Sequence, residues 1–144
     1  MLNFPDFCIR GIRKNDQCFP DQNTVSFTLY MPDTRTREVR DDNGFETSIN
    51  WEDNNDVIRF TLEYRANGQI AYAHGAVKLN KAHIDYINQL PSSANTLSYE
   101  RSPLEDNPHH GNIVFNGGLS KARQRMIAGT LANGSSLIIR LEDL

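Results

Sequence analysis

The stretch Phe45-Glu46-Thr47-Ser48-Ile49-Asn50-Trp51 decides the fold class, and Glu52 and Asp53 follow it directly. Its composition predicts a β-strand. Successive side chains of a strand point to opposite faces, so Glu46, Ser48 and Asn50 share one side and Ile49 and Trp51 share the other. A row of polar groups on one strand face is either a solvated surface or a binding site.

Similar apolar runs elsewhere in the chain predict further short strands, at 7–12, 24–30, 69–79, 97–100, 113–115 and 137–139. Capping residues at Asn80 and Ser120 predict helices over 81–90 and 121–131, the second with Met126 on its apolar side. We therefore expect an α+β fold with a mostly antiparallel sheet and two or three helices.

Residues 56–65 fit two patterns. Ile58, Phe60, Leu62 and Tyr64 alternate with polar residues, as in a strand, whereas Val57, Ile58, Thr61 and Leu62 fit a helical stripe after a run of capping residues. The Asn67-Gly68 pair that follows is typical of a hairpin turn. We expect a strand, with a helix as the alternative.

The chain has 144 residues, which suits a single domain over 1–144. Its formal net charge is −3, so nucleic acid is an unlikely partner, because nucleic-acid binding favours a basic surface. We find no leader-like segment and no apolar run of about 18 residues, so we expect a cytoplasmic protein with no membrane partner.

The two cysteines, Cys8 and Cys18, have no CxxC spacing and no histidine at zinc-ligand spacing. We expect both to be reduced thiols and assign no metal ligands. The residues indicate no particular cofactor.

The segment from Glu105 to Asn112 contains two adjacent histidines beside carboxylates, a proline and a glycine. Pro108 and Gly111 predict an ordered turn whatever the function. His109 or His110 could act as a general acid or base, oriented by Asp106. Because neighbouring residues of an extended segment face opposite ways, the two rings are unlikely ligands of one metal ion.

Two further groups are candidates for binding. Arg10 lies beside Gly11, where a guanidinium could hold a phosphate or carboxylate, and Glu46, Ser48 and Asn50 could complete such a site. The residues from 41 to 56 include six carboxylates and no Lys or Arg. This acidic region could bind a basic partner. Its interaction surface would comprise Trp51, Glu52 and Asp53, with Trp51 as the anchor.

Three segments together resemble small bacterial proteins of no established function: residues 7–12, residues 46–53 and residues 107–113. That resemblance spans most of the chain and implies no named activity. A weaker likeness is to ADP-ribosyltransferase-like folds, in which an early Arg-Gly, a serine on a second strand and a later glutamate frame a nicotinamide cofactor. Arg10, Ser48 and Glu100 occur in that order here, but the usual Ser-Thr-Ser triplet and paired-glutamate loop are absent.

The first hypothesis is a non-catalytic accessory domain of a bacterial system that binds another protein through the acidic region. The alternative is a small hydrolase or transferase that acts on a nucleotide or phosphorylated substrate, with Arg10 on the anion and a histidine of the 107–112 turn moving protons. The alternative requires that these side chains share one pocket.

Overall fold

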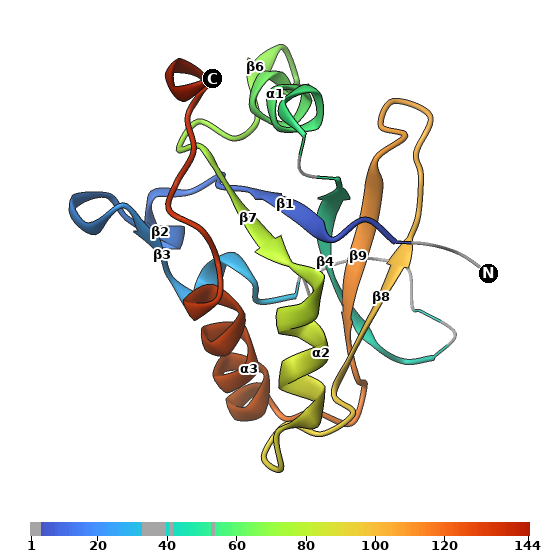
Figure 1. The fold of residues 1–144 in the computed structure, drawn as a ribbon. Helices are drawn as coiled ribbons and strands as arrows, with labels where there is room; N and C mark the ends of the chain where they lie inside the picture. Colours follow the sequence, from blue (N-terminus) through green and yellow to red (C-terminus); the bar gives the residue numbers. More distant parts are fainter. Residues whose placement is uncertain (1–3, 33–39, 41, 53) are drawn as a thin grey trace.

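The computed structural model describes residues 4–32, 40, 42–52 and 54–144 (Figure 1). Its α-helices are α1 (Asn55–Glu63), α2 (Lys81–Gln89) and α3 (Lys121–Asn133). The longer strands are β1 (Phe7–Gly11), β4 (Phe45–Trp51), β7 (Ala76–Asn80), β8 (Leu97–Arg101) and β9 (His110–Phe115). The two-residue strands are β2 (Cys18–Phe19), β3 (Thr24–Val25), β5 (Arg65–Ala66) and β6 (Gln69–Ile70). Short 3-10 turns are η1 (Asn15–Gln17), η2 (Pro20–Gln22), η3 (Phe27–Leu29) and η4 (Leu141–Asp143).

The five longer strands form one sheet in the order β7-β1-β4-β9-β8. Every neighbouring pair in this sheet is antiparallel. Two small ribbons, β2-β3 and β5-β6, lie outside it. The predicted α+β class with a mostly antiparallel sheet is therefore confirmed, and three α-helices accompany it.

One face of the sheet packs against α2 and α3, as Figure 1 shows. The buried side chains there include Ile49 and Trp51 of β4, together with Ile84 of α2 and Ile127 of α3. The alternation predicted for β4 is confirmed, since Ile49 and Trp51 are buried and the intervening Asn50 points to the other face, where it bonds Thr61 of α1.

The opposite face carries α1, which buries Val57, Ile58 and Leu62 against Ile9 of β1 and Ala76 of β7. The strand expected at 56–65 was therefore wrong. Asn54 caps a helix instead, because its Oδ1 accepts from the Val57 amide at 3.1 Å. The Asn67-Gly68 turn does form, but it joins only the two-residue strands β5 and β6.

Three other expected strands are shorter than predicted. The strand expected at 69–79 forms only at its two ends, as β6 and β7. Ser26 ends the strand expected at 24–30, because its Oγ accepts from the Thr28 amide and starts the turn η3. The apolar run at 137–139 pairs with β7 through the single bridge Ala76↔Ile139. These last two segments place apolar side chains in the core without forming a long ladder.

The helices predicted at 81–90 and 121–131 are confirmed as α2 and α3, and each begins at the expected capping residue. Asn80 Oδ1 accepts from the Ala82 amide, and Ser120 Oγ accepts from the Arg123 amide. Met126 was expected on the apolar side of α3 and is instead 43% exposed. Among the described residues, no helix has the length and apolar character needed to cross a membrane.

Candidate functional site

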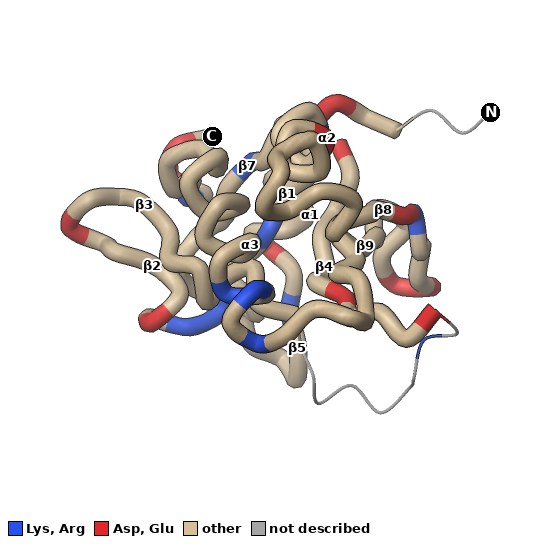
Figure 2. The backbone as a smooth tube through the Cα atoms, turned by 90° about the horizontal axis from the view of Figure 1, so that it is seen from below, with Lys and Arg blue, Asp and Glu red and all other residues tan. Residues whose placement is uncertain are grey.

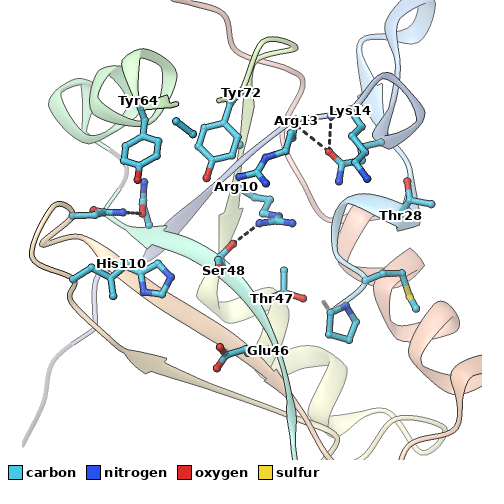
Figure 3. A pocket seen from close by; sticks show the side chains of 18 of the residues that line it. Arg10, Arg13, Lys14, Thr28, Glu46, Thr47, Ser48, Tyr64, Tyr72 and His110 are labelled. Carbon is cyan, nitrogen blue, oxygen red and sulfur yellow. Dashed lines mark hydrogen bonds between the residues drawn. The ribbon is translucent and has the colours of Figure 1, made fainter. Parts of the chain in front are cut away.

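A cavity of about 610 Å³ opens beside the sheet where β1 and β4 separate (Figure 3). The two strands pair at Cys8↔Trp51 and Ile9↔Asn50. Beyond that point β4 continues toward Phe45 beside β9. The neighbouring residues Thr47 and Ser48 therefore both line the cavity, although they face opposite sides of the sheet. Its volume lies in the range typical of small-molecule sites.

Most of the polar residues expected to form a composite site line this one cavity. They are Arg10, Glu46, Ser48, Asn50 and His110. Asp106 and His109 are not part of the lining. Asp53 lies outside the described residues, and Glu52 follows β4 with a φ of 85°, away from the cavity lining.

Arg10 is fixed at the point where the strands separate. Its Nε donates to Leu29 O at 3.0 Å, and its Nη1 donates to Ser48 O at 2.9 Å. These two carbonyls belong to η3 and β4, so the guanidinium joins the segment before residue 32 to the sheet. Figure 3 shows it between Ser48 and the side chains of Arg13 and Tyr72. A guanidinium held in this way needs little reorganisation to contact an anion.

His110 is the first residue of β9, and its ring extends into the cavity (Figure 3). Its Nδ1 lies 2.7 Å from Ser102 O. A carbonyl oxygen can only accept, so Nδ1 carries the hydrogen. In the neutral ring Nε2 then carries the lone pair, which is the arrangement a general base requires.

The neighbouring His109 has a different environment. Its ring packs edge-on against Phe60 of α1, with the centroids 5.2 Å apart and the planes at 74°. The backbone amide of His109 donates to Asn107 Oδ1 at 3.0 Å. The prediction that the two rings face different ways therefore agrees with their contacts, and His109 does not line this cavity.

A chain of buried amide and hydroxyl groups holds the histidine turn to the sheet and to α1. Asn107 Nδ2 donates to Asn50 Oδ1 at 2.8 Å, and Asn50 Nδ2 donates to Thr61 Oγ1 at 2.8 Å. Thr61 Oγ1 in turn donates to Val57 O at 2.9 Å. Asn50 was expected to bind substrate, and its amide instead has two protein partners. The sequence pattern alone did not indicate Asn107 or Thr61.

Glu46 lies at the edge of the cavity in an ion-pair network with Arg40. Arg40 Nη1 lies 2.7 Å from Glu46 Oε2, and Arg40 Nη2 lies 2.8 Å from Glu100 Oε1. The guanidinium also pairs with Asp42. The hydrogen bond from Arg40 holds the pKa of Glu100 below its usual value. The single positive charge of Arg40 is thus shared among the carboxylates of Asp42, Glu46 and Glu100.

Asp106 was expected to orient a histidine. Its Oδ2 instead accepts from the hydroxyl of Tyr64 at 2.9 Å. That hydrogen bond is the main reason why the pKa of Tyr64 is raised. Asp106 consequently supports a wall of the cavity, because Tyr64 is one of the lining residues.

Trp51 was expected to be an exposed anchor for a partner protein, and that expectation was wrong. The side chain is 1% exposed, and its Nε1 donates to Glu100 O at 2.9 Å. Strand alternation places it on the face covered by α2 and α3, where its ring also contacts Phe4 and Tyr99.

Several lining residues were not singled out from the sequence: Arg13, Lys14, Thr28, Tyr64 and Tyr72. Arg13 and Lys14 follow Arg10 so closely that three cations within five residues could have indicated an anion site. The tyrosines gave no such signal, because their placement depends on the small β5-β6 ribbon. Figure 2 shows Lys and Arg positions gathered between β2 and β5.

The residues of the ADP-ribosyltransferase-like likeness lie in one region. Ser48 and Glu100 are both paired with Asn112, from opposite sides of β9. Asn112 Nδ2 donates to Glu100 Oε2 at 2.8 Å. Arg10 and Ser48 line the cavity, whereas Glu100 lies on β8, which β9 separates from β4, and pairs with Arg40.

Across the part of the chain that the structure describes, no group of three or more His, Cys, Asp or Glu side chains could hold a metal ion. Comparisons with protein-family models, with curated proteins and with solved structures found no match. The interpretation of the cavity therefore depends on its own chemistry.

Proposed function

We propose that the chain is a small hydrolase or transferase that acts on a nucleotide or phosphorylated substrate in this cavity. The observation that supports it best is the convergence of Arg10, Ser48 and His110 on one cavity from three separate strands. A catalytic site requires its functional side chains to share one cavity, whereas the polar residues of a solvated face need not converge.

The charge of the lining favours an anion. Arg10, Arg13 and Lys14 contribute three positive charges, whereas Asp16 and Glu46 contribute two negative ones. Glu46 pairs with Arg40, which lies outside the lining and also pairs with Asp42 and Glu100. Among the lining residues that the structure describes, basic side chains therefore outnumber acidic ones by three to two, although the whole chain carries a formal net charge of −3. Phosphate oxygens are the usual partners of such an arrangement of Arg and Lys.

His110 would supply the proton transfer. Its Nε2 can accept a proton from an attacking water or acceptor hydroxyl, because Nδ1 already donates to Ser102 O. The cations would stabilise the negative charge that develops on the substrate, and the Ser48 hydroxyl would bind it by a hydrogen bond. A general acid or base of this kind typically contributes 10²- to 10⁴-fold in rate, as an order of magnitude.

The protein-binding role stays a prediction with less support. It relied on Trp51 as an exposed anchor, and that side chain is buried. Glu46, within the acidic region, is paired with Arg40.

The test is to incubate the chain with a panel of nucleoside phosphates and sugar phosphates and to follow the products by phosphorus NMR and mass spectrometry. We expect turnover of at least one compound and expect His110→Gln to lower its rate about 100-fold or more. His109→Gln is the matched control, because that ring packs against Phe60 outside the cavity. Equal losses in the two variants, or no turnover of any compound, would contradict the proposal.

A further inference from the structure

The cavity has an aromatic wall that a simple phosphate would leave unused. Tyr64 and Tyr72 both line it, with ring centroids 6.3 Å apart and planes at 29°. Figure 3 shows the two rings side by side. Both side chains are partly exposed. A flat surface of this kind is suited to stacking with a planar heterocycle.

Each ring is held in place by a neighbouring residue of the fold. The hydroxyl of Tyr64 donates to Asp106 Oδ2 at 2.9 Å. Tyr72 lies against Gly11, where an added Cβ would be only 2.3 Å from the ring Cγ. The wall therefore has a fixed shape before any ligand binds, and a ligand would not have to order it.

Positive charge lies directly beside this wall. The guanidinium carbon of Arg13 is 5.7 Å from the centre of the Tyr72 ring. Lys14 is the next residue, and the backbone amides of both donate to Gln17 Oε1 at 2.9 and 3.0 Å. The same glutamine thus fixes the backbone that carries both cations. A ligand that uses the wall and the cations together must have a planar ring and an anionic group.

We propose that the ligand is a nucleoside phosphate, with its base against Tyr72 and Tyr64 and its phosphate groups toward Arg13, Lys14 and Arg10. This inference rests on the proposed function, because it names the substrate class of the same cavity. The base is contacted through its face, and stacking of that kind discriminates weakly between bases. The phosphates then lie on the same side of the wall as Arg10. Arg10 donates to the Ser48 carbonyl, and Ser48 and His110 line the same cavity.

Isothermal titration calorimetry on the full chain tests it with four probes: ADP, adenosine, ribose 5-phosphate and inorganic pyrophosphate. We expect ADP to bind at least about tenfold more tightly than any of the other three, because only ADP has both a base and a diphosphate. Tyr72→Leu should weaken ADP binding about tenfold and leave pyrophosphate binding unchanged. Tyr86→Leu is the control, since Tyr86 is 52% exposed on α2 and does not line the cavity.

The outcomes separate the inference from the function on which it rests. If pyrophosphate and ADP bind equally and Tyr72→Leu changes neither, the inference is overturned and the anion site stands. Adenosine binding as tightly as ADP would overturn the placement of phosphate at the cations. If none of the four probes binds, the proposed function fails as well. The comparison among probes uses the unaltered chain, so it decides the question even if a variant does not fold.

Discussion

Asn107 donates from its side-chain amide to Asn50 Oδ1 at 2.8 Å, although the two residues are 57 positions apart in the chain. Both side chains are buried, at 7% and 8% exposure. This hydrogen bond joins the histidine turn to β4 and, through Thr61, to α1. This hydrogen bond is enough to explain why the turn is ordered, whether or not the turn takes part in catalysis.

The first prediction concerns this bond. Asn107→Ala leaves Asn50 Oδ1 buried without its donor, and such a loss costs about 1–3 kcal/mol in the free energy of unfolding. Urea denaturation followed by circular dichroism measures it. Asn133→Ala is the matched control, because Asn133 is exposed at the end of α3, and it should change the free energy by about 0.5 kcal/mol or less. Equal effects of the two substitutions would show that the bond contributes little.

Arg40 is the subject of the second prediction. The pKa of Glu100 is lowered in the folded chain, chiefly by its hydrogen bond with Arg40. A lowered carboxyl pKa stabilises the fold above the ordinary pKa of the group, and that contribution is lost as the pH falls through the folded pKa. Arg40→Gln should therefore lower the free energy of unfolding by roughly 1 kcal/mol at neutral pH. The figure is kept small because the side chains of Arg40 and Glu100 are both partly exposed, so that solvent screens the ion pair.

The difference between the unaltered chain and Arg40→Gln should shrink as the pH is lowered toward about 3, where carboxylates become protonated. Urea denaturation at several pH values measures this. Arg125→Gln provides the comparison, because Arg125 is exposed on α3, and its effect should not depend on pH in the same range. A constant difference between Arg40→Gln and the unaltered chain at every pH would rule out the ion pair as its cause.

Gly11 supports the third prediction. A Cβ at this position would lie 2.3 Å from the Cγ of Tyr72, so Gly11→Ala must displace that ring. We expect a loss of about 1–3 kcal/mol in the free energy of unfolding, as for other overpacked sites. In Tyr72→Ala the same glycine substitution should cost much less, because the clashing ring is gone. A double-mutant cycle measured by thermal or urea unfolding gives the coupling.

Gly118→Ala is the control for that cycle, because the nearest heavy atom to its added Cβ would be Asn116 Oδ1 at 3.6 Å. Additive effects of Gly11→Ala and Tyr72→Ala would mean that the ring does not rest on Gly11. The aromatic wall would then lack the fixed shape described above.

The fourth prediction uses Trp51, the single tryptophan of the chain. Its burial predicts that acrylamide quenches the intrinsic fluorescence weakly in the folded chain and strongly after unfolding in urea. Trp51→Phe should cost about 1–3 kcal/mol, because Glu100 O loses its donor and the ring volume shrinks. Strong quenching in the folded chain would restore Trp51 as a candidate for a partner surface.

The sequence predicted the parts of the fold that depend on local pattern. Alternation in β4 and the caps at Asn80 and Ser120 each depend on a few neighbouring residues, and each was confirmed. Residues 56–65 carried two periodicities at once, and the helix formed because Asn54 caps it and because Ile9 and Ala76 offer an apolar face. That face is contributed by strands distant in sequence, which a local pattern does not contain.

The same distinction applies to the site. Arg10 and the polar side of β4 could be named because their residue types suit anion binding. The choice between His109 and His110 required the register of β9, and the burial of Trp51 required knowing which sheet face α2 and α3 cover. Tyr64 and Tyr72 reach the cavity through the tertiary placement of α1 and the β5-β6 ribbon, so no spacing along the chain predicts that they line it.

The hydrogen bonds from Thr61 through Asn50 to Asn107 have a consequence for reactivity. A general base must lie within about 3 Å of the proton donor, so a displacement of about 1 Å is enough to separate them. His110 lies three residues after Asn107, which bonds Asn50. Asn50 in turn bonds Thr61, which lies on the same helix as the buried Ile58 and Leu62. If His110 acts as the proposed general base, the buried side chains of α1 would help to set the distance over which the proton travels, although none of them would contact the ligand.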